Sequence, residues 1–238
     1  MFHYKQRSSE QEIMDDLEME GEELATTLRQ IAMVNRWLGG SEVALQGLKK
    51  LLKNIPRTEQ PIRILDIGCG GGEILRLIAD WGRKTGRKLE LIGMDANLFT
   101  INYAAAESKA YPEICFEQVN VFAEEFANLQ FDVAICSLFM HHFTNEEIIQ
   151  LLKIMKPAAK IGLIINDLER SALAHFLFNG VTAILGASKM VRYDGKLSIK
   201  RGFIKKDWQE LLTAVPVDKY SIQWKWAFRH QIIIPKTK

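Results

Sequence analysis

One short segment constrains the fold of this chain more than any other. An apolar run over residues 62–67 passes through a glycine-rich loop into a helical pattern that begins near residue 74. The loop contains Gly68, Gly70 and Gly72. Because glycine has no Cβ and tolerates positive φ, a ligand can lie directly against the backbone of such a loop. The segment therefore predicts a buried strand, a ligand-binding turn and a helix start.

The loop does not suit a nucleotide pyrophosphate. The dinucleotide fingerprint requires a third glycine where this chain has Glu73. Phosphates would also lie close to the carboxylates of Asp66 and Glu73, and no Gly-Lys-Ser/Thr follows to make a P-loop. A ligand with a cationic amino group fits Asp66 better.

Composition sets broad limits. The chain has 238 residues, of which 47% are hydrophobic, enough for one large α/β domain with a small cap. Its net charge of +2 is too small to indicate a nucleic-acid partner. Three cysteines in or beside apolar runs have no C-x-x-C spacing, which predicts reduced thiols in a cytoplasmic protein.

No targeting or membrane segment is expected. The first residues are polar and lack the apolar core of a signal peptide. The longest apolar stretch, residues 172–187, is shorter than the roughly 18 residues of a membrane span. A helix that covers a pocket or packs in the core is the interpretation for this stretch.

The first 60 residues predict a helical cap or lid. Residues 10–24 are strongly acidic, and apolar residues then recur at helical spacing up to Gly39. A second helix is expected over residues 41–52. The main domain is predicted to span residues 61–238.

After residue 61, strands and helices alternate. Strands are predicted over residues 62–67, 89–94, 114–121, 131–136 and 160–165, and helices over 72–85, 98–109 and 144–156. Thr144 and Glu147 form a capping box at the start of the last helix. Apolar strands that alternate with helices indicate a parallel sheet covered on both faces.

The C-terminal part departs from this alternation. We expect a helix near 171–187, a polar loop, a short helix over 207–215, and a hairpin of strands 220–228 and 231–234 turning at Arg229-His230. Residues 170–215 are a possible insertion that lines an acceptor pocket. A Rossmann-like, seven-stranded α/β sheet, mostly parallel with an antiparallel C-terminal hairpin, is the predicted fold.

The glycine loop resembles motif I of the class I S-adenosylmethionine (SAM)-dependent methyltransferases. That motif is hydrophobic-Asp-x-Gly-x-Gly-x-Gly, matched by Asp66, Gly68, Gly70 and Gly72. The resemblance covers roughly residues 60–235, including the terminal hairpin. It implies SAM as the cofactor and S-adenosylhomocysteine as its product.

The family's cofactor contacts can be carried onto the strand ends. They imply that Asp66 binds the cofactor's ammonium, Asp95 its ribose hydroxyls, and Asn120 its adenine amino group. The neighbouring positions with implied cofactor contacts are Gly68, Cys69, Gly70, Gly72, Ala96, Val121 and Cys136.

Each of the three polar residues also has a structural alternative. Asp66 can brace the loop by accepting backbone hydrogen bonds. Asp95 can cap the helix at 98–109, although Asn97 can serve that purpose as well. Asn120 can simply form a turn.

The end of the fourth strand carries the candidate catalytic residues. Residues 135–143 resemble the fourth motif of bacterial small-molecule methyltransferases that act on quinones and phenols. A histidine titrates near neutral pH, so His142 is the candidate general base, with His141 beside it. Capping or packing of the next helix is the alternative for either histidine.

Weaker candidates lie on the acceptor side. They are Phe139, Asp167, Arg170 and His175. Arg36 is a candidate partner for the cofactor's carboxylate, or else part of an exposed salt bridge. No metal is predicted, because the fourth strand ends in Cys136-Ser137 where metal-dependent relatives carry a carboxylate.

A basic tract allows a rival function. Its members are Lys189, Arg192, Lys196, Lys200, Arg201, Lys205 and Lys206. They predict either a solvated loop or a site for RNA or a phosphorylated acceptor. The Asn/Asp-Pro-Pro-aromatic run of methyltransferases that modify nucleic-acid bases is missing from the sequence.

The sequence thus predicts a SAM-dependent methyltransferase acting on a hydroxyl of a small hydrophobic or aromatic acceptor, as a monomer or homodimer. The alternatives are N- or C-methylation, RNA methylation, and a protein that binds SAM without catalysis.

Overall fold

A single seven-stranded sheet forms the centre of the molecule. The computed structural model describes residues 6–236. The strand order is β3-β2-β1-β4-β5-β7-β6. The strands are β1 (Ile62–Ile67), β2 (Leu89–Asp95), β3 (Ile114–Gln118), β4 (Phe131–Ser137), β5 (Ala159–Leu168), β6 (Ser221–Lys225) and β7 (Arg229–Pro235).

The sheet has a topological switch point at its centre. Strands β1 to β5 pair in parallel, and β7 pairs antiparallel with both β5 and β6. From β1 the chain builds outward through β2 and β3, then returns to place β4 on the other side. Ligands of open α/β sheets bind beyond the carboxyl ends of the strands at such a point.

Helices cover both faces of the sheet. They are α1 (Glu22–Trp37), α2 (Gly40–Leu51), α3 (Glu73–Thr85), α4 (Leu98–Glu107), α5 (Glu124–Ala127), α6 (Asn145–Ala158), α7 (Ala172–Ile184), α8 (Lys189–Arg201) and α9 (Lys205–Thr213). Two 3₁₀ turns, η1 (Ile13–Asp15) and η2 (Met140–His142), complete the described elements.

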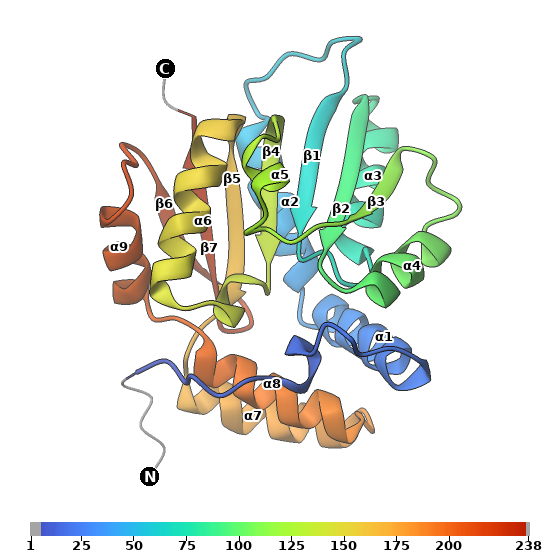
Figure 1. The fold of residues 1–238 in the computed structure, drawn as a ribbon, viewed down its shortest axis with the longest axis vertical. Coiled ribbons are helices and arrows are strands. Elements are labelled where there is room, and N and C mark those ends of the chain that lie inside the picture. Colours follow the sequence, from blue (N-terminus) through green and yellow to red (C-terminus); the bar gives the residue numbers. More distant parts are fainter. Residues whose placement is uncertain (1–5, 237–238) are drawn as a thin grey trace.

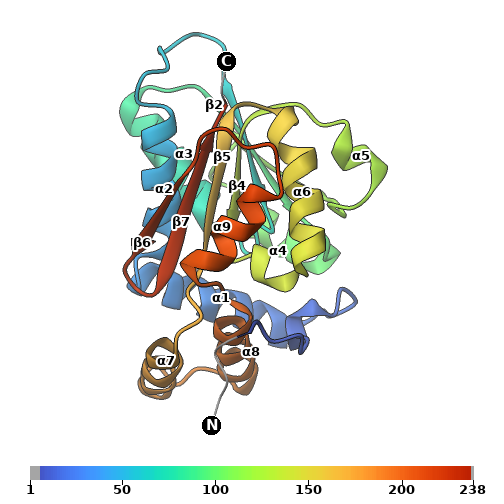
Figure 2. The same cartoon turned by 90° about the vertical axis from the view of Figure 1, so that its left-hand side faces the viewer.

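The core consists of two apolar layers separated by the sheet. Helices α2 and α3 pack on one face, while α5, α6 and α9 pack on the other (Figure 2). Fully buried Trp208 stacks on Phe203 in the second layer, with ring centroids 4.2 Å apart. This arrangement holds the carboxyl ends of β1, β2 and β4 at one edge.

A second group of elements lies beneath that edge. Helices α1, α7 and α8 and the N-terminal segment lie below the carboxyl ends of the strands (Figure 1). Buried Asp194 on α8 accepts hydrogen bonds from the backbone N–H groups of Ile13 (2.8 Å) and Met14 (3.1 Å). These hydrogen bonds hold the N-terminal segment, residues 6–21, against α8 below the carboxyl ends of the strands (Figure 1).

The predicted fold class is confirmed, and two local predictions are wrong. Residues 189–201 form helix α8 rather than a polar loop, because Ser188 caps the helix and Asp194 is buried by its contacts with η1. The hairpin turns at residues 226–228, since Arg229 and His230 are paired in β7 against β5. Within residues 6–236, no helix is long and apolar enough to cross a membrane.

Candidate active site

The glycine loop is positioned by the neighbouring strand. The N–H groups of Gly68 and Cys69 both donate to the carbonyl of Met94 at the end of β2, at 2.8 and 3.0 Å. Gly68 has no room for a side chain, because a Cβ there would lie 2.2 Å from the ring of Phe139. At Gly70, which has a φ of +50°, a Cβ would meet no atom closer than 3.9 Å. Gly70 therefore leaves open the space that a ligand needs.

Asp66 is an unsatisfied carboxyl group beneath this loop. Its side chain is 1% exposed, and neither oxygen has a hydrogen-bond partner among the described residues. Burial, together with the charges of Glu73 and Asp95, holds the pKa of Asp66 well above its usual range. A ligand ammonium would supply both the missing charge and the missing donors, so the site fits an amino-acid moiety.

Asp95 lies at the end of β2 and lines the cavity. Its carboxylate accepts hydrogen bonds from the N–H groups of Gly70 (3.2 Å) and Asn97 (3.1 Å). Asn97, not Asp95, caps helix α4, since its side chain accepts from Thr100 N–H at 2.8 Å. Asp95 is thus free of the capping role, and burial raises its pKa.

Asn120 follows β3 on the opposite wall. Its side-chain oxygen accepts a hydrogen bond from Phe122 N–H at 3.0 Å, which is the turn role allowed by the sequence. Asn120 is exposed and lines the cavity together with Val121. The adenine role stays a prediction for these two residues.

His142 combines access with an acidic partner. It lines the cavity with 25% of its side chain exposed, and its Nδ1 lies 2.6 Å from Asp15 Oδ1. Burial alone would raise the pKa of Asp15, but His142 and Arg201 outweigh it and hold this pKa well below its usual range. In the tautomer in which Nδ1–H donates a hydrogen bond to the Asp15 carboxylate, Nε2 carries no proton and can accept one.

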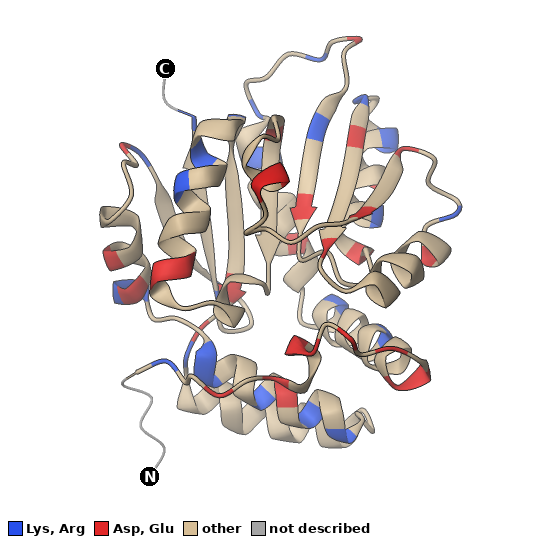
Figure 3. Ribbon diagram, viewed as in Figure 1, with Lys and Arg blue, Asp and Glu red and all other residues tan. Residues whose placement is uncertain are grey.

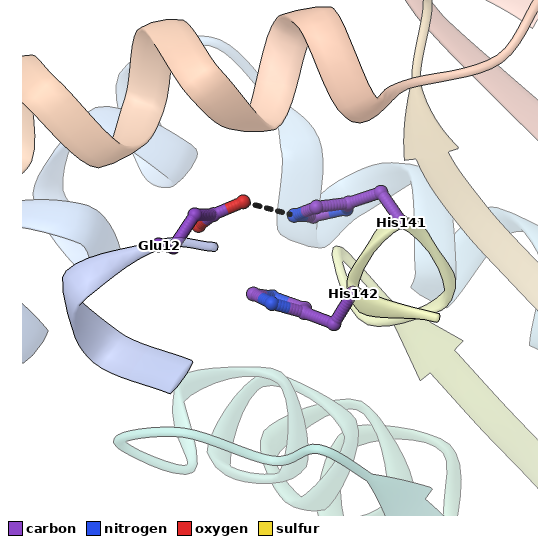
Figure 4. A group of neighbouring side chains, drawn as sticks. All are labelled: Glu12, His141 and His142. Atoms are coloured by element: carbon purple, nitrogen blue, oxygen red, sulfur yellow. Dashed lines mark ion pairs between the residues drawn. The ribbon is translucent and has the colours of Figure 1, made fainter. Parts of the chain in front are cut away.

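His141 forms a second, buried pair behind the first. Its Nδ1 is 2.7 Å from Asp167, and its Nε2 is 3.6 Å from Glu12 Oε1 (Figure 4). The two imidazole rings lie 4.3 Å apart. The capping alternative does not apply to either histidine, because Thr144 caps α6 through the predicted box with Glu147. The alternative of packing is consistent with buried His141.

Arg201 fixes the backbone that carries both histidines. Its guanidinium donates to the carbonyls of His141 (3.0 Å) and His142 (2.5 Å) and to Asp15 (2.6 Å). Arg7 adds a hydrogen bond to the His141 carbonyl at 3.1 Å. The histidine pair is therefore held from the N-terminal segment and from α8 together.

The same cluster contains potential metal ligands. One ligand atom each from Glu12, His141 and His142 lies within 4.8 Å of the others. However, the Arg201 guanidinium lies 3.9 Å from Glu12 and 2.6 Å from Asp15, and so already supplies a cation to these carboxylates. The Asp15–His142 and Asp167–His141 pairs are equally suited to proton transfer, so the cluster alone does not call for a metal.

One large cavity connects the loop to the histidines. Its volume is about 1450 Å³, above the range of roughly 300–1,000 Å³ that is typical of a single small-molecule site. His142 and Asp95 both line this cavity, together with the loop residues Gly68 and Gly70. The cavity therefore has room for a cofactor and a second ligand side by side.

The remaining predicted residues divide into two groups. Cys69, Ala96, Phe139 and Arg170 line the cavity. Cys136 is buried behind the wall, Asp167 is fully buried against His141, and Gly72 caps α3. His175 and Arg36 are outside the cavity lining, and Arg36 is exposed. The position of Arg36 does not support a contact with a cofactor carboxylate.

Four important residues were missed from the sequence. Glu12 and Asp15 belong to an acidic run that favours solvent, and Arg201 belongs to the basic tract. The fourth is Arg229, which the sequence suggested for a turn. Its guanidinium is buried on the cavity wall, where Nη2 donates to Asn35 at 2.8 Å. Its Nε and Nη1 have no hydrogen-bond partner in the described chain, and burial lowers its pKa to about 10.

The substitution Glu12→Gln should change how stability depends on pH. Burial raises the pKa of Glu12 from 4.5 to about 7. The stability due to protonated Glu12 is therefore fully present below pH 4.5 and is lost as the pH rises through 7. Since one pKa unit corresponds to about 1.4 kcal/mol, the loss is at most about 3.5 kcal/mol.

Urea unfolding of both proteins at several pH values checks this. The glutamine variant should gain stability relative to the natural protein as the pH rises from about 4.5 to 8. A difference in unfolding free energy that is constant over this interval would contradict the buried, protonated state of Glu12.

Comparison with known proteins identifies the domain. Residues 64–162 match the family model described as a methyltransferase domain. This region contains the glycine loop, Asp95, Asn120 and both histidines. No match was found among curated proteins.

Solved structures share the fold at low sequence identity. The plantazolicin methyltransferase BpumL, in complex with SAH, has 18% identity and a TM-score of 0.66, over 90% of this chain and 94% of its own. The CMeT domain of the citrinin polyketide synthase has 17% identity and a TM-score of 0.60, over 80% and 50%. A putative O-methyltransferase from Nostoc punctiforme has 14% identity and a TM-score of 0.60, over 88% and 60%. Residues 64–162 thus match a methyltransferase domain, and the solved structures share the fold of the chain.

Proposed function

We propose that this protein is a SAM-dependent methyltransferase that transfers the methyl group to a hydroxyl oxygen of a small hydrophobic or aromatic acceptor. The observation that carries the proposal is the Asp15–His142 pair, which lines the same cavity as Asp95, the predicted ribose carboxylate. A hydroxyl is a poor nucleophile until its proton is removed, whereas a positioned neutral imidazole can remove it. With a hydroxyl as the acceptor, the Asp15–His142 pair would serve to remove the hydroxyl proton.

The chain's residues suit the cofactor as follows. Asp66 would pair with the ammonium, Asp95 with the ribose hydroxyls, and the loop from Gly68 to Gly72 would cradle the amino-acid part. Arg229 replaces Arg36 as our candidate for the carboxylate, because two of its nitrogens lack partners on the cavity wall. When bound, SAM supplies an electrophilic methyl group, so the protein chiefly orients and deprotonates the acceptor.

His142 acts as the general base in this proposal. Its Nε2 takes the acceptor's proton, and the resulting imidazolium is stabilised by ionised Asp15. Arg201 keeps Asp15 and the histidine backbone in place. His141 is buried between Asp167 and Glu12, and its ring packs against the His142 ring and helps to position it.

The cavity wall supports a hydrophobic acceptor. Its apolar side chains come from α1, the β4 loop and α7, namely Leu24, Leu28, Ile31, Phe139, Phe143, Leu177, Phe178 and Val181. A mostly apolar wall with a few polar groups is typical of sites for small aromatic ligands. In this proposal residues 1–60 contribute the lid and residues 170–215 the acceptor side.

An assay of S-adenosylhomocysteine formation tests the function. Phenols and aromatic hydroxy acids should support turnover, whereas amines of matched shape should not. Turnover with the amines alone would favour N-methylation, and SAM binding without turnover on a broad panel would favour a non-catalytic protein.

A further inference from the structure

Helices α7 and α8 each have an inner face on the cavity and an outer face that takes no part in lining it. From α7, Ala174, Leu177, Phe178 and Val181 line the cavity, and from α8, Val191, Asp194, Gly195, Ser198 and Ile199 do so. The inner faces therefore account for the helices' structural role. The composition of the outer faces requires a separate explanation.

The outer face of α7 is apolar. Leu173, Phe176 and Ile184 have the spacing of one helical stripe and are 57%, 72% and 87% exposed. The helix contains no Asp, Glu, Lys or Arg and is uniformly tan in Figure 3. Exposure of apolar side chains to water is unfavourable, and several of them on one face of a helix indicate an interaction surface.

The outer face of α8 is basic with the same spacing. Lys189, Arg192 and Lys196 follow one another at intervals of three and four residues, with half-exposed Tyr193 beside them. Figure 3 shows the basic positions along α8. Helices α7 and α8 are in contact and lie side by side in Figures 1 and 2.

We propose that the paired outer faces of α7 and α8 dock on an anionic lipid bilayer. The apolar stripe of α7 would enter the interface between headgroups and acyl chains, and the basic stripe of α8 would contact negative headgroups. Charge complementarity selects this partner. RNA would leave the apolar stripe unused, and a second copy of the chain would bring another basic stripe close to the first.

This surface gives the cavity a route to its acceptor. The same two helices carry the bilayer-facing stripes on their outer faces and line the cavity with their inner faces. A hydrophobic acceptor dissolved in the lipid would therefore be concentrated close to the cavity. Only this delivery step rests on the proposed function. Binding to lipid is measured without turnover, so the two proposals fail separately.

Vesicle co-sedimentation of the full chain tests the proposal. The protein should bind vesicles of phosphatidylcholine with phosphatidylglycerol more tightly than phosphatidylcholine alone, and binding should weaken as salt rises. The double variant Phe176→Ser/Ile184→Ser should bind at least about tenfold more weakly, since it removes two exposed apolar side chains that would insert into the bilayer. Lys189→Glu/Arg192→Glu should lose at least about tenfold on the anionic vesicles.

Matched variants elsewhere control for general surface effects. Leu98→Ser removes an exposed apolar residue from α4, and Lys84→Glu/Lys109→Glu reverses two exposed charges outside α7 and α8. Both should bind vesicles like the natural protein, and all variants should keep its melting temperature. Absence of vesicle binding, or equal losses in the controls, would overturn the proposal. So would a concentration-dependent dimer that Phe176→Ser/Ile184→Ser abolishes without changing vesicle binding.

Discussion

Replacement of His142 by alanine is expected to lower kcat by about 10²–10⁴-fold, the usual contribution of a general base. The affinity for SAM should remain nearly unchanged, because none of the predicted cofactor contacts comes from η2. Steady-state kinetics at saturating acceptor, combined with calorimetric titration of SAM, separate the two effects.

The variant His142→Asn sharpens this test. An asparagine amide can still donate to Asp15 in place of Nδ1 but has no basic nitrogen at the Nε2 position. It should therefore retain the fold while losing activity like alanine. Normal turnover in His142→Asn would show that His142 is not the general base and has only a structural role.

Replacement of Asp95 by alanine should weaken SAM binding by roughly 1.5–3 kcal/mol, the scale of a hydrogen bond to a charged group. This corresponds to about ten- to a hundredfold in Kd. Part of the loss would come through the loop, since Asp95 also accepts from Gly70 N–H at 3.2 Å. Titration calorimetry measures the change directly.

Asp95→Asn and Glu107→Ala make the comparison specific. Asparagine keeps one oxygen acceptor and should lose less affinity than alanine. Glu107 is an exposed carboxylate on α4, and its removal should leave SAM binding unchanged. An Asp95→Ala variant that binds SAM normally would remove the ribose role.

Much of the sheet could be predicted because its strands are buried on both faces. Continuous apolar runs such as residues 62–67 and 131–136 need no knowledge of partners to be recognised. Helix α8 could not be predicted in this way. Asp194 and Gly195 interrupt its apolar pattern. Asp194 is buried through its hydrogen bonds to η1, and Gly195 lies against Phe178 of α7.

The candidate site shows the same limit. The strand-end residues Asp66 and Asp95 could be predicted because local sequence places them at the sheet's edge. Glu12 and Asp15 could not, because only the folded N-terminal segment brings an acidic run against His141 and His142. Arg229 was missed because one strand boundary was placed after it rather than before it.

The position of the transferred methyl group tests the central claim most directly. The enzyme is incubated with SAM carrying a ¹³C-labelled methyl group and a phenolic acceptor that supports turnover, and the product is examined by NMR. We expect the label in an aryl methyl ether, with one S-adenosylhomocysteine formed per label transferred. Label on a nitrogen or on a ring carbon would contradict the assignment of His142 as the base for an oxygen acceptor.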